Sequence, residues 1–159
     1  MAQSDTVDRI LDAAEVLFAE RGFSETSLRM ITSKANVNLA AVNYHFGSKN
    51  ALIQAVFSRF LSPFASSLEH ELNKIPENHV DQPVDIETLL GIVTSCIVRV
   101  PSRNKAGVSV FMRLLGLAYT QSQGHLRKYL EQEYSRAFKM FMKYMREATP
   151  QLSAVDRFW

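Results

Sequence analysis

The amino-acid sequence predicts an all-α protein, and three observations support this fold class. Apolar residues recur at steps of three and four along almost the whole chain, whereas the strict alternation typical of a strand is never sustained. Capping residues and glycines divide this pattern into helical lengths. The stretch "NLAAVNYHFGSKNAL", residues 38–52, holds a short helix, a glycine and the start of another helix. We therefore expect a three-helix head over residues 1–48 and a second helical domain over residues 49–159.

The head is expected to contain three helices, of which the last is about two turns long. A helix of that length is unstable in water and needs its neighbours for support. Polar N-caps are expected before the second and third helices, and glycines after the first and third. The expected helices cover residues 6–21, 28–34 and 39–46, with Thr26 or Ser27, and Asn38, as caps and Gly22 and Gly47 as stops.

The second domain is expected to contain four longer helices. Two prolines within the polar stretch "IPENHVDQPV" forbid a continuous helix there, and Pro63 is expected to kink the first helix. At the C-terminus Ser153 starts a further apolar-periodic segment that ends at once, so we expect this chain to be shorter than the natural protein. The expected helices run from Ser48 to Asn73, from Asp85 to Val98, and over residues 106–121 and 125–148.

The composition is that of an ordinary globular protein, with 47% hydrophobic and 21% charged residues. No apolar run reaches the roughly 20 residues of a membrane span, and the N-terminus lacks a signal peptide, so a cytoplasmic location is expected. The single cysteine, Cys96, lies in an apolar stretch and is expected to be a core residue. We expect neither an enzyme nor a cofactor, because no catalytic or metal-ligand spacing is present.

The net charge of +2 conceals a division along the chain. Residues 1–25 are mainly acidic, whereas residues 26–62 carry basic residues and no acid. Such an asymmetry allows one face to meet the phosphates of a nucleic acid; the alternative is a set of scattered, solvated charges. The basic residues of the second segment are Arg29, Lys34, Lys49 and Arg59.

The spacing of the second and third helices is that of a helix-turn-helix, whose second helix enters the major groove. Small side chains at Ala40 and Ala41 would let this helix approach base edges, while Val42 and Phe46 turn inward. The side chains of Tyr44, His45 and Lys49 would then reach the flanking phosphates.

Residues 9–57 resemble the DNA-binding domain of the TetR family of transcriptional repressors. The matching features are "YHF" at residues 44–46, Ser48-Lys49, Leu52, Gly22-Phe23, Thr26-Ser27 and Val37. The resemblance implies that Tyr44 and Lys49 bind phosphates, that Leu39, Ala40, Ala41 and Asn43 face the bases, and that Arg29 reaches a phosphate or a guanine. We also expect Asn38, the cap of this helix, to be a DNA-binding residue.

Several roles remain open within this prediction. Asn43 replaces the usual tyrosine of the family, and either reads an adenine edge or contacts a phosphate. Asn36 stands where glycine is common. Tyr44 could belong partly to the core, and His45 either packs beside the helix or donates to a phosphate.

The TetR resemblance implies that the second domain binds a ligand and forms a homodimer on a palindromic DNA operator. Within "AGVSVFMRLLGLAYTQ", Arg113 is expected amid hydrophobic residues, where a ligand carboxylate would suit it; the alternatives are an internal ion pair or an exposed charge. The predicted ligand-binding residues, for which a packed core is the default alternative, are Phe60, Phe64, Phe111, Arg113, Leu114, Leu117, Phe138 and Phe141.

A wider similarity extends over "FMRLLGLAYTQSQGHLRKYL" and the final "FW". These segments resemble the PsrA-type subgroup, whose members are fatty-acid-responsive repressors of fatty-acid degradation genes. The resemblance implies release from the operator by a long-chain fatty acid or acyl thioester. The alternative function is a helical lipid-binding or carrier protein without DNA binding.

Overall fold

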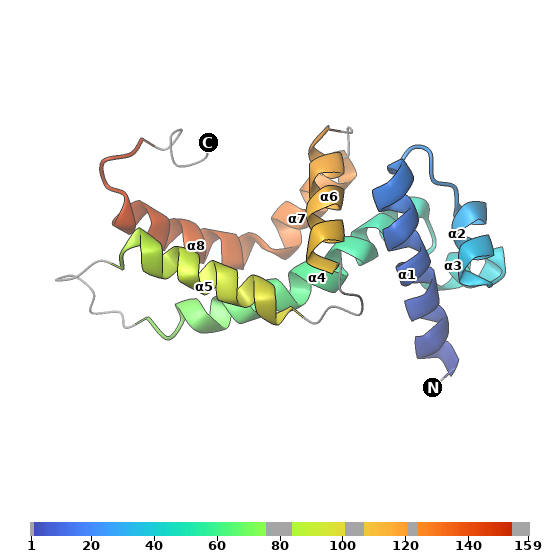
Figure 1. The fold of residues 1–159 in the computed structure, drawn as a ribbon, viewed down its shortest axis with the longest axis horizontal. Coiled ribbons are helices and arrows are strands. Elements are labelled where there is room, and N and C mark those ends of the chain that lie inside the picture. Colours follow the sequence, from blue (N-terminus) through green and yellow to red (C-terminus); the bar gives the residue numbers. More distant parts are fainter. Residues whose placement is uncertain (1, 76–83, 101–106, 121–123, 154–159) are drawn as a thin grey trace. The chain divides into compact units, whose positions relative to one another are not determined.

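The computed structural model describes residues 2–75, 84–100, 107–120 and 124–153, and these form eight helices and no strand (Figure 1). The predicted all-α class is therefore confirmed. The helices are α1 (Ala2–Arg21), α2 (Leu28–Ala35), α3 (Leu39–Phe46), α4 (Lys49–Leu72), α5 (Ile86–Arg99), α6 (Gly107–Thr120), α7 (Gly124–Glu133) and α8 (Ser135–Ala148).

The chain folds into two compact units. The first contains the described parts of residues 1–60 and 102–129, and the second those of residues 61–101 and 130–159. Each unit therefore takes part of the long helix α4. The sequence predicts a different division, with a head over residues 1–48 and a second domain from residue 49. That boundary stays a prediction.

The core of the first unit grows from the apolar stripe of α1. Ile10, Ala14 and Phe18 on that stripe are fully buried. Phe23 continues the core, with ring centroids 5.3 Å from Phe18 and 6.2 Å from Phe57 on α4. Burying a large apolar side chain stabilises a fold by about 1.5–3 kcal/mol, so these rings hold the head on the first half of α4.

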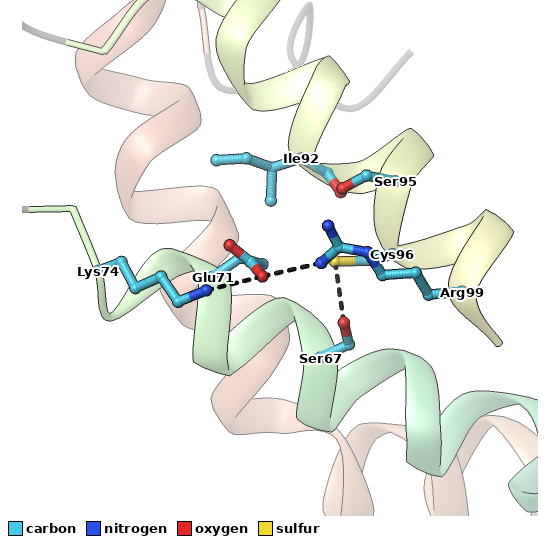
Figure 2. A network of polar contacts seen from close by, with 7 residues as sticks. All are labelled: Ser67, Glu71, Lys74, Ile92, Ser95, Cys96 and Arg99. Atoms are coloured by element: carbon cyan, nitrogen blue, oxygen red, sulfur yellow. Dashed lines mark hydrogen bonds and ion pairs between the residues drawn. The ribbon is translucent and has the colours of Figure 1, made fainter.

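The core of the second unit lies between α4, α5 and α8, around Leu68, Leu72, Leu89 and Cys96. Cys96 is fully buried, as predicted. Beside it, Glu71 accepts hydrogen bonds from Lys74 and Arg99, each 3.0 Å long (Figure 2). Two hydrogen bonds lower the pKa of the Glu71 carboxyl: the one from Lys74 has the larger effect, and the one from Arg99 has a smaller effect.

The predicted single helix over residues 125–148 is wrong, because the structure divides it into α7 and α8. Tyr134, between them, has φ −111° and ψ 13°, outside the helical region. Its hydroxyl lies 2.9 Å from the Ser62 Oγ on α4. This long-range hydrogen bond favours a break at Tyr134 that no local signal marks.

Other boundaries differ little from the prediction. The first helix begins at Ala2 rather than residue 6, and Pro63 lies inside a continuous α4. Most of the predicted linker, the turn at residues 101–105 and the segment after Ser153 lie outside the described residues. Within the described ranges, no helix combines the length and apolar character needed to cross a membrane.

Candidate nucleic-acid interface

The segment from α2 to α3 has the geometry of a helix-turn-helix, and each helix is capped by its own sequence. The Ser27 Oγ accepts a hydrogen bond from the Met30 N–H (3.2 Å), and the Asn38 Oδ1 accepts one from the Ala41 N–H (2.8 Å). The cap of α2 is thus Ser27, while Thr26 is buried. Helix α3 has the predicted bounds, residues 39–46.

The turn between α2 and α3 depends on Asn36, which has φ 52° and ψ 53°. This is the left-handed region, where glycine and asparagine are tolerated best. The Val37 N–H then donates to the Thr32 carbonyl (3.0 Å), closing a Schellman-type end of α2. The chain is thereby redirected into α3 within three residues.

One side of α3 faces the core of the first unit. Val42 is the buried residue of this helix, with an exposed fraction of 0%. Phe46 is half-buried, so its predicted inward direction is met only in part. These contacts hold α3 against the head without covering its other side.

The opposite side of α3 is uncovered by the described residues of the chain. Tyr44 is 77% exposed, which contradicts a partial core role, and Leu39 is 38% exposed. The rings of Tyr44 and His45 meet edge to face with centroids 5.0 Å apart. The other predicted DNA-binding residues are placed as follows: Arg29, Asn38, Ala40 and Asn43 are exposed, and Ala41, His45 and Lys49 are half-buried.

Arg59 belongs to the predicted basic segment, but its guanidinium contacts α1 and not the outer side of α3. Its guanidinium on α4 faces three carboxylates of α1, at 3.6 Å from Asp8, 2.6 Å from Asp12 and 3.6 Å from Glu15. Burial raises the pKa of the Glu15 carboxyl, and Arg59 opposes that shift. The acidic stretch of α1 thus packs in part against α4, and Arg59 joins two helices.

Thr26 and Arg9 also hold the head together, through contacts that were not predicted. The buried Thr26 hydroxyl donates to the carbonyls of Leu17 (3.1 Å) and Gly22 (2.8 Å). The Arg9 guanidinium donates to the carbonyls of Ala35 and Asn36, both at 2.5 Å. The partners of Arg9 are 26 and 27 positions away along the chain, so no local pattern could reveal them.

The second unit contains an apolar pocket with a volume of about 320 Å³. Three predicted ligand-binding residues, Phe64, Phe138 and Phe141, line it together. Among the residues that the structure describes, no charged side chain lines it. Its lining is Leu61, Phe64, Ala65, Leu68, Val93, Tyr134, Ala137, Phe138 and Phe141.

The remaining predicted ligand-binding residues lie in the first unit. Phe60 and Phe111 stack with centroids 3.9 Å apart at 11°, and Leu114 is buried, as in a packed core. Leu117 is half-buried. The expected enclosure of Arg113 is wrong, because Arg113 is exposed: α6 buries the side that carries Phe111 and Leu114.

No group of three or more His, Cys, Asp or Glu side chains in the described residues is placed to hold a metal ion. The capped α2–α3 pair with an uncovered outer side instead defines a protein with a helix-turn-helix head. Residues 10–56 match the model of bacterial regulatory proteins of the tetR family, and residues 93–159 match a tetracyclin repressor-like C-terminal domain. The chain belongs to the TetR family of transcriptional regulators.

Curated relatives share the head region. The chain is 37% identical over 70 residues to the probable HTH-type transcriptional regulator YttP of Bacillus subtilis, a match that covers 44% of this chain and 34% of that protein. It is also 37% identical over 76 residues to the HTH-type transcriptional repressor Rv3405c of Mycobacterium tuberculosis, covering 48% and 39%. The matched part thus spans little more than a third of these relatives.

Among solved structures, the multidrug binding protein EbrR, crystallised with imidazole, has a similar fold. The comparison gives a TM-score of 0.54 at 19% identity and covers 91% of this chain and 72% of the other. At that identity the similarity supports the fold alone.

Proposed function

We propose that this chain is a ligand-responsive, DNA-binding transcriptional regulator whose helix α3 reads base edges in the major groove. The observation that carries the proposal is the uncovered outer side of a capped α3, with Tyr44 77% exposed. A groove-reading helix needs such a side, because base edges are reached only by close approach. Family membership and the HTH-type relatives support the same function.

The predicted DNA-binding positions divide by chemistry. Leu39, Ala40, Ala41 and Asn43 lie on α3, where small and apolar groups meet base edges and an amide forms paired hydrogen bonds. Tyr44, Lys49 and Arg29 supply hydroxyl and cationic donors for phosphates. Asn38 uses its Oδ1 as the helix cap and keeps its amide nitrogen as a donor. His45 either donates to a phosphate or only supports the Tyr44 ring.

Binding to DNA from the upstream region of the gene tests these roles. Replacing Lys49 by Ala should weaken binding about tenfold and reduce the slope of log affinity against log salt by about one. Tyr44→Phe, which removes one neutral donor, should weaken binding about threefold. Lys139→Ala, at an exposed position of α8, is the charge-matched control. Unchanged affinity and slope in both head variants would refute the proposal.

We also propose that the regulator acts as a homodimer on a palindromic operator. One short helix offers few base contacts, and two heads about one DNA turn apart supply the affinity of specific complexes. Sedimentation of the protein with DNA should therefore show two chains per site.

For the effector, we propose a long-chain fatty acid or acyl thioester that leads to release from DNA and regulates fatty-acid degradation genes. The apolar lining and volume of the pocket support a hydrophobic tail. Arg113 does not line this pocket, so the carboxylate contact expected from the sequence is not part of the proposal. A ligand shifts the protein between states only by its differential affinity for them.

Lipid extraction and mass spectrometry of the purified protein test this effector. The proposal expects an acyl species, and expects added fatty acid to lower DNA affinity. An acyl species without any DNA binding would favour the alternative of a lipid carrier. Absence of acyl species and of any fatty-acid effect on DNA affinity would eliminate the fatty-acid subgroup and leave the family assignment standing.

A further inference from the structure

We propose that Arg9 is a positioning residue for DNA recognition, and that its guanidinium sets the direction of α3 by holding the turn before it. The proposal rests on the DNA-binding function proposed above. The Nη2 of Arg9 on α1 donates to two successive carbonyls, those of Ala35 and Asn36, at 2.5 Å each. Those carbonyls belong to the last residue of α2 and to the C-cap that follows it.

The chemistry of a helix end explains why a cation binds there. The last carbonyls of a helix have no partner within the helix and carry its partial negative charge. A guanidinium donates to such carbonyls and remains charged at any physiological pH. Arg9 therefore neutralises the end of α2 where the chain turns toward α3.

The position of the contact links it to the reading helix. Asn36 adopts the left-handed conformation, and Asn38, two residues later, caps α3. The peptide of Asn36 thus determines where α3 starts, and its carbonyl is one of the two that Arg9 holds. Movement of this carbonyl would redirect the whole of α3, since the helix follows within three residues.

Thr26 supplies a matching contact at the other end of the α1–α2 pair. Its hydroxyl donates to carbonyls of Leu17 and Gly22, near the C-terminal end of α1. The positions Arg9 and Gly22 on the α1 segment are about 20 Å apart at 1.5 Å per residue. Helix α2 is therefore tied to α1 at both ends, and Arg9 supplies the tie next to the turn.

A direct phosphate contact by Arg9 is the competing role, since its side chain is 39% exposed. The two roles differ in their effect on salt dependence. Loss of a phosphate contact weakens binding to every sequence and reduces the salt slope by about one. Loss of a positioning contact weakens the base contacts of α3 and leaves phosphate binding elsewhere in place.

The test compares Arg9→Met, which keeps the apolar stem and removes the donors, with Arg9→Lys, which retains a charged donor. Arg21→Met, at the exposed end of α1, is the charge-matched control. Affinity is measured over a range of salt concentrations for a duplex that the unaltered protein selects from a random pool, and for a duplex of unrelated sequence. Should Arg9→Met fail to fold, Arg9→Ala, which also removes the donors, replaces it with the same expectations.

The proposal expects Arg9→Met to bind the selected duplex about tenfold more weakly and the unrelated duplex almost normally, with an unchanged salt slope. Arg9→Lys should restore most of the lost affinity, and Arg21→Met should behave like the unaltered protein. Equal affinity of Arg9→Met and the unaltered protein for the selected duplex would overturn the proposal. An equal loss on both duplexes with a smaller slope would also overturn it, in favour of a phosphate contact. If the unaltered protein selects no duplex, the proposed function itself fails.

Discussion

The guanidinium Nη1 of Arg59 on α4 lies 2.6 Å from the Oδ1 of Asp12 on α1. Asp8 and Glu15 lie within 3.6 Å of the same guanidinium, so one cation holds three carboxylates. The contact ties the first helix of the head to the helix that leaves it. Its strength and its pH dependence can both be measured.

Replacing Arg59 by Met should destabilise the protein by about 1–3 kcal/mol, since three clustered carboxylates then lose their shared cation. The loss of stability should be smaller than for a fully buried ion pair, because Asp12 is 52% exposed and solvent screens it. Urea unfolding at neutral pH measures the change, and Arg21→Met serves as the control. A loss no larger than that of the control would mean that the cluster contributes nothing to stability.

The raised pKa of Glu15 predicts a pH dependence of opposite sign to that of most carboxylates. Burial is the main cause, and it makes the folded state bind this proton more tightly than the unfolded state. The contribution to stability is complete below the ordinary pKa of 4.5 and is lost as pH rises through the raised value. Glu15→Gln, which has no charge to bury, should gain stability relative to the unaltered protein between about pH 4 and pH 7. A constant difference across that range contradicts the prediction.

The left-handed Asn36 predicts a residue-specific stability change. Asn36→Ala should cost about 1 kcal/mol, because a Cβ without a compensating polar group is disfavoured in this conformation. Asn36→Gly should be neutral or slightly stabilising, since glycine adopts positive φ freely. Thermal unfolding of both variants measures this order. A glycine variant less stable than the alanine variant would contradict this backbone explanation.

The pocket of the second unit predicts a separable defect. Ala137 is buried and lines the pocket, so Ala137→Leu should fill part of its 320 Å³ and weaken binding of a fluorescent fatty acid about tenfold. DNA affinity without fatty acid should be unchanged. Ala19→Leu, at a buried position of α1 remote in sequence, controls for overpacking. Normal fatty-acid binding by Ala137→Leu would place the ligand elsewhere.

The sequence predicts best what is determined locally. The bounds of α3 are predicted from Asn38 and Gly47 because a cap and a stop act on the residues beside them. The break at Tyr134 was missed because its partner, Ser62, is 72 positions away. The roles of Arg9 and Arg59 were not predicted either, because their partners are also distant along the chain.

The exposure of Arg113 could not be predicted for a different reason. Apolar periodicity indicates that α6 is amphipathic, but two apolar stripes flank Arg113 and the pattern does not state which is buried. The structure buries Phe111 and Leu114 and leaves Arg113 exposed. Likewise, the structure divides the aromatic residues predicted for one pocket between two packed units. The sequence could not predict this division, because hydrophobicity does not distinguish a pocket from a core.

The DNA affinity of Ala40→Glu shows whether the outer side of α3 enters the duplex. Ala40 is exposed on α3, so a glutamate there should leave the thermal stability unchanged while placing a negative charge against the base edges. Gln132→Glu, an exposed site on α7, is the charge-matched control. We predict about a 100-fold loss of affinity for the selected duplex in Ala40→Glu alone. Equal affinity of Ala40→Glu and the control would contradict the claim that the outer side of α3 enters the DNA duplex.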